Sequence, residues 1–127
     1  MITYAERACF EASHLRVLER VEVYVARISN AWGNELRCHE LARAVHRVAC
    51  KTLEVVDGKY GPIEHSWLRF SDGAILDPYV PGRLPAVQIV DPIVGMEYRP
   101  GAPREDIRHP IIDRLVLEMR RRSEGYK

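Results

Sequence analysis

The first quarter of the chain carries apolar residues at the spacing of an amphipathic helix. Between residues 3 and 32, apolar side chains recur every three or four positions with charged residues between them, at Leu15, Leu18, Val21, Val25 and Ile28. This spacing places them on one face of a helix. A break near Ser13 or His14 divides the region into a short first helix and a longer second one.

A third helix is predicted over residues 35–50, where it would bury Leu36, Leu41, Val45 and Val48. Gly33-Asn34 ends the preceding helix, and Asn34 is suited to cap the next one. The pattern leaves open whether this third helix begins at Glu35 or nearer to Cys38. That choice decides whether Cys38 lies at the helix tip or deeper in its first turn.

From residue 52 onward the pattern changes to that of strands and turns. Strands are predicted over 52–56, 63–70, 74–77 and 86–90, with turns at 57–62 and 71–73. Residues 92–110 contain four prolines and two glycines and are predicted to be irregular. A closing helix over 111–122 places Ile112, Leu115 and Met119 on one stripe.

Helices followed by consecutive strands predict the α+β class. We expect one domain over residues 1–127, in which N-terminal helices pack on a small antiparallel sheet and a C-terminal helix closes the fold. A chain of 127 residues is long enough to build one hydrophobic core without the help of disulfides or bound metals.

Composition and charge narrow the expected partners and location. Hydrophobic residues make up 46% of the chain and charged residues 29%, with a formal net charge of +1. Such a charge provides no overall field that attracts nucleic acid or an anionic membrane. No apolar run approaches the roughly 18–20 residues of a membrane span, and the N-terminal residues lack a signal-peptide pattern. We therefore expect a cytoplasmic protein with no nucleic-acid or membrane partner.

The three cysteines, Cys9, Cys38 and Cys50, are odd in number and lack CxxC spacing. A disulfide framework and a zinc ribbon are therefore disfavoured. His39-Glu40 begins like the HExxH motif of zinc proteases, but Arg43 stands where the second histidine is needed. No metal and no cofactor is expected.

A histidine and an aspartate lie on either side of the predicted turn at 71–73. If this turn is a three-residue loop with Gly73 in the left-handed conformation, His65 faces Tyr79 and Asp77 lies diagonally on the same face. The backbones of diagonal neighbours on adjacent strands are roughly 7–8 Å apart, so an imidazole and a carboxylate at such positions can form a hydrogen bond. A two-residue loop would instead place Asp77 on the opposite face.

A bonded carboxylate fixes the tautomer of a histidine and makes its other ring nitrogen a better base. Cys38, near the start of the third helix, is the candidate nucleophile for that base. The positive end of a helix dipole and a neighbouring imidazolium both favour the thiolate near neutral pH. Chain order lets Cys38, His65 and Asp77 converge where the helix start meets the sheet.

The segments CHELARAV, EHSWLRF and GAILDPYVPG resemble the core of the transglutaminase-like group of papain-fold cysteine enzymes. That group shows a cysteine at a helix start, His-x-Trp on a strand and an aspartate on the next strand. The resemblance covers about residues 34–80. It implies a papain/transglutaminase-like core with Cys38 as nucleophile, His65 as base and Asp77 as the carboxylate that orients it.

Each candidate also has a purely structural interpretation, which the sequence leaves open. Cys38 could be a packed core thiol, and His65 could hold a buried polar group. Asp77 before Pro78 is a common turn starter. Trp67 could border the substrate groove together with Tyr79, or it could belong to the core.

Two functions from different classes follow. The first is a cysteine-dependent acyl hydrolase or acyl transferase acting on an amide or thioester bond of a peptide or small-molecule substrate. The second is a non-catalytic interaction or inhibitor protein that keeps the same fold and binds a partner protein. The substrate, the acceptor and the oligomeric state are not determined by the sequence.

Overall fold

Helices and strands segregate along the chain as the α+β prediction requires. The computed structural model describes residues 12–79, 88–90 and 97–124. The elements in chain order are the helix α2 (Ala12–Ala26), the 3-10 helix η1 (Asn30–Glu35), the helix α3 (Cys38–Ala49), the strands β1 (Glu54–Tyr60), β2 (Ile63–Arg69), β3 (Ile75–Asp77), β4 (Gln88–Val90) and β5 (Tyr98–Pro100), and the helix α4 (His109–Glu124).

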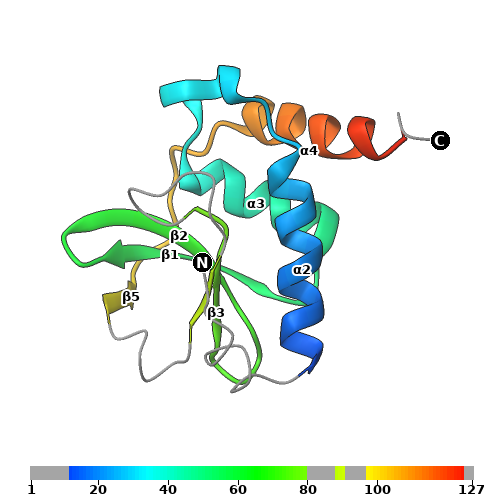
Figure 1. Cartoon of the computed structure of the whole chain (residues 1–127). Coiled ribbons are helices and arrows are strands. Elements are labelled where there is room, and N and C mark those ends of the chain that lie inside the picture. The colour runs from blue at the N-terminus through cyan, green and yellow to red at the C-terminus, as the bar shows by residue number, and fades with distance from the viewer. Residues whose placement is uncertain (1–11, 80–87, 91–96, 125–127) are drawn as a thin grey trace.

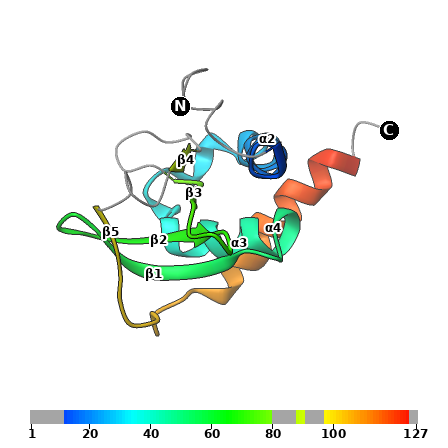
Figure 2. The same cartoon turned by 90° about the horizontal axis from the view of Figure 1, so that it is seen from below.

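The five strands form one antiparallel sheet with the order β4-β3-β2-β1-β5. The longest pairing joins β1 and β2 and sets Val56 opposite Trp67 and Gly58 opposite His65. The pairing between β2 and β3 covers Leu68 and Arg69, so the first part of β2 runs past the end of β3. Figures 1 and 2 show the β1–β2 hairpin extending away from the helices.

The three α-helices gather on one side of the sheet (Figures 1 and 2). α3 packs against β1, β2, α4 and α2. Buried apolar residues of these elements form the main core, which includes Leu18, Val21, Leu41, Val45, Leu68, Leu76, Leu115 and Met119. Because side chains alternate along a strand, Trp67 and Ile75 point to the other face, where they pack with Val56 and Tyr98. No helix in the described ranges is both long enough and apolar enough to cross a membrane.

The helix boundaries differ from the predicted ones. α2 ends at Ala26 rather than near Trp32, and η1 follows with the Ser29 hydroxyl accepting a hydrogen bond from the Ala31 N–H. Gly33, at φ 50° and ψ −129°, interrupts the helical conformation inside η1, and the N-cap position of α3 is Arg37 instead of the predicted Asn34. The predicted short first helix lies largely outside the described residues.

The strand boundaries also need correction. Residues 57–60, predicted to be part of a turn, belong to β1, so the turn shortens to Gly61 and Pro62, with Gly61 at φ 57°. Pairing with β2 and β5 on both sides outweighs the weak strand propensity of Asp57 and Gly58. Strand β5 lies in the region predicted to be irregular.

α4 begins at His109, two residues before the predicted start. The predicted irregular region extended to Pro110, but this proline lies in the first turn of α4, where it is tolerated because its missing N–H has no intrahelical partner.

The buried carboxylate of Glu40 joins α3 to α4. Its side chain is 0% exposed and accepts hydrogen bonds from the guanidinium groups of Arg37 and Arg108 and from the Arg108 backbone N–H. Burial alone would raise its pKa, but the arginine contacts lower it to about 2. An ionised carboxylate therefore holds the start of α3 against the start of α4.

Gly58 allows strands β1 and β5 to approach closely. A Cβ atom at this position would lie 2.1 Å from the carbonyl oxygen of Arg99 and 2.9 Å from the backbone nitrogen of Gly101. The backbone of Gly101 in turn donates to the Asp57 carbonyl over 2.8 Å. A side chain at position 58 would therefore displace β5, which carries Tyr98.

We expect Gly58→Ala to lower the free energy of unfolding by about 1–3 kcal/mol, because the added methyl group meets backbone that cannot move without losing sheet pairing. Urea denaturation followed by circular dichroism measures this change. Lys59→Ala, at the exposed neighbouring position, is the control and should stay within about 0.5 kcal/mol of wild type. An unchanged urea midpoint for Gly58→Ala would show that the β1–β5 approach is not tight.

Candidate active site

Cys38 is the first residue of α3, so the helix begins three residues later than its earliest predicted start. Leu36 and Arg37 are extended, and the Leu41 N–H donates to the Arg37 carbonyl to open the helix. Arg37 occupies the N-cap position, but its side chain bonds Glu40 and Asp106 and caps no α3 backbone group within the described chain. The Cys38 thiol therefore sits at the positive end of the helix dipole.

The β2–β3 turn has the three-residue form that the site requires. The Phe70 N–H donates to the Ala74 carbonyl over 2.8 Å, and Gly73 has a φ of 93°. Leu68 pairs with Leu76, and the continued register sets Trp67 opposite Asp77. Of the two registers that the sequence leaves open, the structure has the one with the three-residue turn, and His65 and Asp77 lie diagonally on one face.

His65 and Asp77 are hydrogen-bonded through Nε2 and Oδ2 over 2.8 Å. The exposed fractions are 2% for His65 and 0% for Asp77, so water competes little for this bond. The same Oδ2 atom accepts a bond of 2.8 Å from the Tyr98 hydroxyl, while Oδ1 accepts one of 3.0 Å from the Tyr79 N–H. Asp77 thus starts the turn before Pro78 and also orients the imidazole, so the two interpretations of this residue are compatible.

The side chains of Cys38 and His65 interact directly and shift each other's pKa. Burial raises the pKa of the Cys38 thiol, but hydrogen bonds with His39 and His65 lower it more, to about 6. Burial lowers the pKa of His65, but the contacts with Asp77 and Cys38 raise it to about 9. Because Nε2 is held by Asp77, Nδ1 is the nitrogen left for the sulfur. Between pH of about 6 and 9, the favoured state is a thiolate–imidazolium pair.

Trp67 lies under the site and not at its surface. It is 1% exposed and stacks on the His65 ring with a centroid distance of 6.0 Å and an interplanar angle of 27°. Its other neighbour, Tyr98, meets it edge-on at 5.2 Å. The indole has almost no accessible surface, which favours the core interpretation of Trp67 over the groove interpretation that the sequence also leaves open.

Tyr79 is half-buried, as expected for a residue at the edge of a site. Its pKa is raised by burial and by the negative charge of Cys38. Among the described residues, Tyr79 is therefore the better candidate for a substrate contact.

The sequence prediction missed a second set of polar residues beside Cys38. His39, Ser66 and Asp57 are all buried and are linked by hydrogen bonds. The signal available in the sequence was the register of β1 and β2, which sets Asp57 opposite Ser66, one position along from His65. The assignment of 57–62 to a turn concealed it.

Cys50 shows what an ordinary buried thiol does in this fold. Burial raises its pKa to about 12, and its sulfur contacts the Val45 carbonyl oxygen at 3.5 Å. Within the described part of the chain, no three His, Cys, Asp or Glu side chains are arranged to hold a metal ion. Cys38 differs from Cys50 because it has two imidazoles beside it.

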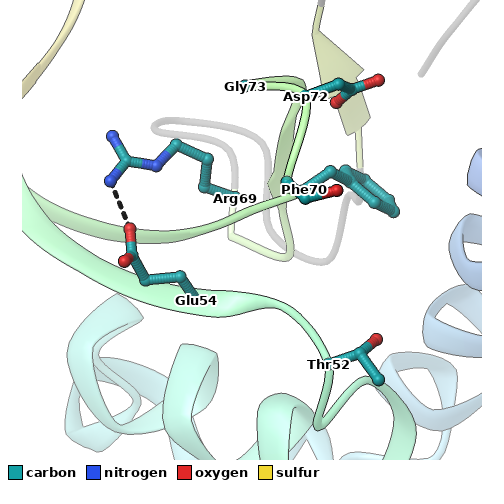
Figure 3. A pocket seen from close by; sticks show the side chains of 7 residues that line it. Thr52, Glu54, Arg69, Phe70, Asp72 and Gly73 are labelled. Atoms are coloured by element: carbon teal, nitrogen blue, oxygen red, sulfur yellow. Dashed lines mark hydrogen bonds and ion pairs between the residues drawn. The ribbon is translucent and has the colours of Figure 1, made fainter.

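A surface cleft at the far end of β2 is separate from this site. It is lined by residues 52, 54 and 69–73, and the Arg69 guanidinium points across it to Glu54 (Figure 3). Arg69 lies four residues beyond His65, which corresponds to about 13 Å along a strand. Another cleft, between α3 and α4, is lined by Arg43, His46, Arg47, Lys51, His109 and Ile112. Neither cleft includes Cys38, His65 or Asp77.

Comparisons with protein-family models, with curated proteins and with solved structures found no match to this chain. The chemistry that the site can perform is therefore inferred from its own geometry. That geometry contains a thiolate at a helix start, an imidazolium beside it and a buried carboxylate that orients the imidazolium.

We expect Cys38 in the native protein to react with iodoacetamide at a rate that rises through an inflection near pH 6, because the thiolate is the reacting form. Peptide mass spectrometry after alkylation between pH 4 and pH 9 measures the rate at each cysteine. Cys50, with its pKa raised to about 12, should stay unmodified until the protein unfolds. An inflection at the ordinary thiol value, near pH 8.5, would show that the ion pair does not form.

Asp77→Asn should lower the pKa of His65 from about 9 toward its ordinary value of 6.5, because the largest contribution that raises it is lost. With a lower pKa, His65 loses its positive charge at a lower pH and stabilises the thiolate less. The inflection in the alkylation rate of Cys38 should therefore move to higher pH. Histidine ring signals in an NMR titration report the first change. Asp72→Asn, on the exposed turn of the same hairpin, is the control and should change neither the pKa of His65 nor the alkylation inflection of Cys38.

Proposed function

We propose that this protein is a cysteine-dependent acyl hydrolase or acyl transferase acting on amide or thioester bonds. The observation that carries the proposal is the thiol at the first residue of α3, hydrogen-bonded to a histidine whose other nitrogen is held by a buried aspartate. A nucleophile, a base and a residue that orients the base are the three parts of a covalent acyl-transfer site.

In the first half of the reaction, the Cys38 thiolate attacks the carbonyl carbon of the substrate. The C–N bond breaks, and the leaving amine takes the proton of the His65 imidazolium, so a thioester and a free amine result. Asp77 keeps the imidazole in the required tautomer, and Tyr98 and the Tyr79 N–H hold that carboxylate in place. The Trp67 and Tyr98 rings pack around His65 and limit its contact with water.

The start of α3 provides donors for the oxyanion of the tetrahedral intermediate. The first N–H groups of a helix have no intrahelical partner, and the Arg37 side chain does not cap those of Cys38 and its neighbours. Each well-placed donor of this kind stabilises the transition state by roughly 2.7–4 kcal/mol. The same helix end therefore favours both the thiolate and the oxyanion.

In the second half, water or an amine attacks the thioester and releases the acyl group. Water gives hydrolysis, and an amine gives transfer. The substrate class that fits is a peptide or small-molecule amide whose carbonyl group reaches the sulfur past Tyr79. The reaction needs a reduced thiol, which agrees with the cytoplasmic location expected from the sequence.

The exposure of the site favours one alternative, a non-catalytic interaction or inhibitor protein. Cys38 is 9% exposed and His65 only 2%. A partner protein could bind the surface around the site while the buried triad serves the fold. The two functions differ in whether the native protein forms a covalent bond with an acyl donor.

The test is acylation by p-nitrophenyl acetate, with intact-mass detection of an acetyl group and a burst of nitrophenolate. Wild type should acetylate at Cys38, and Cys38→Ser should not. His65→Gln should acylate roughly tenfold to a hundredfold more slowly near pH 7, because the thiolate loses its counterion. Cys50→Ser is the matched control and should behave as wild type. A wild-type protein that stays unmodified at Cys38 until it unfolds would support the interaction protein.

A further inference from the structure

A second chain of buried polar groups reaches Cys38 from the face of the sheet opposite to His65 and Asp77. His39 Nδ1 lies 2.7 Å from the Ser66 hydroxyl, which donates to Asp57 Oδ1 over 2.5 Å. Asp57 Oδ2 accepts a bond of 2.6 Å from Arg43 and one of 3.0 Å from the Arg104 N–H. The triad described above uses none of these groups.

The count of protons along this chain fixes the tautomer of His39. Burial raises the pKa of Asp57, but its contacts with Arg43, Ser66 and the Arg104 N–H lower it further, so the carboxylate is ionised and can only accept. The single hydroxyl proton of Ser66 is therefore committed to Asp57. Ser66 must accept from His39, which places an imidazole proton on Nδ1 and makes Nε2 the ring nitrogen that can accept a proton.

The acceptor nitrogen of His39 is close to the reacting atom. The Cys38 sulfur lies 3.5 Å from Nδ1 and 3.9 Å from Nε2, beside the edge of the ring that joins them. His65 is held by a carboxylate and carries the positive charge of the ion pair, whereas the direct partner of His39 is a neutral hydroxyl. The two imidazoles beside the thiol therefore differ: His65 carries the positive charge of the ion pair, whereas His39 presents its Nδ1–H to Ser66 and lies 3.5 Å from the sulfur through the same nitrogen, so its Nε2 can accept a proton.

A purely structural role for this chain is the competing explanation. Ser66 and Asp57 lie on β2 and β1, and the chain does join α3 to the sheet. Burying these groups is nevertheless costly unless every one is paired, and an apolar contact would join the elements at lower cost. A structural chain also has no need to end on the side chain of a reactive thiol.

We propose that His39 is a second catalytic base, which deprotonates the water or amine that attacks the thioester on Cys38. This rests on the acyl-transfer function proposed above. The oxygen of water bonds to the acyl carbon, one water proton moves to His39 Nε2, and the C–S bond breaks with its electron pair returning to sulfur. The proton then passes from His39 to His65 and restores the thiolate–imidazolium pair. Ser66 and Asp57 are positioning residues for this step.

The variant that tests the proposal is His39→Asn, because the asparagine amide can still donate to Ser66 from the position of Nδ1 while the Nε2 acceptor is removed. With p-nitrophenyl acetate, nitrophenolate leaves without needing a proton. Loss of the His39 contact raises the pKa of Cys38, so the two proteins are compared on the alkaline plateau of the burst rate, where the thiol is ionised in both. There the burst rate should stay within about twofold of wild type. The steady-state rate, which reports deacylation by water, should fall by about 10²-fold, and acetylated Cys38 should accumulate.

Hydroxylamine separates a chemical role from a structural one. It is a strong nucleophile that attacks thioesters without a general base, so it should restore the turnover of His39→Asn to near that of wild type treated in the same way. Ser66→Ala frees the imidazole from its fixed tautomer and should slow deacylation less than His39→Asn does. Urea midpoints of both variants show whether the fold is intact.

The outcomes are distinguishable. If wild type and His39→Asn deacylate at the same rate, or if the burst slows as much as deacylation, His39 is not the second base, although acyl transfer at Cys38 stands. If hydroxylamine leaves His39→Asn slow, the residue acts on the structure of the site and the proposal is overturned. If wild type forms no acyl-enzyme at all, the proposed function fails and this inference fails with it.

Discussion

The site depends on one hydrogen bond, between the imidazole of His65 and the carboxylate of Asp77. This bond exists only in one register of β2 and β3, because a slip of one residue would move Asp77 to the other face of the sheet. The three-residue turn with Gly73 at positive φ sets that register. The charge and orientation of the His65 imidazolium follow from it, and this imidazolium lowers the pKa of Cys38 together with His39.

Around this bond, the described part of the fold buries three carboxylates. Glu40 is fully buried between α3 and α4, and Asp57 and Asp77 are buried on either face of the sheet. Each carboxylate is matched by donors, so none is left as an uncompensated charge. Glu40 contacts Arg37, directly before Cys38, and Asp57 reaches His39 through Ser66. Asp77 reaches the same region through His65.

Prediction from the sequence succeeded where the pattern was local. About ten residues of sequence are enough to predict each of three features that the structure contains: the apolar stripe of α2, the β2–β3 turn and the closing helix α4. It failed where long-range pairing competes with propensity. Asp57 and Gly58 look like turn residues, yet β1 continues through them because β2 and β5 pair on both sides. His39 was judged against a zinc motif, and its bond to Ser66, 27 positions away, could not be seen.

The sequence by itself determined the α+β class and the choice of Cys38 as the thiol to examine, and it placed His65 and Asp77 on either side of one turn in two possible registers. The structure has the register of the three-residue turn. Tertiary structure alone decided that α3 begins at Cys38, that Trp67 is buried beneath the imidazole, and that a second imidazole meets the thiol. The reason is that helix starts and buried contacts depend on what packs against them. Those partners come from strands and loops distant in the chain, whose positions no local pattern encodes.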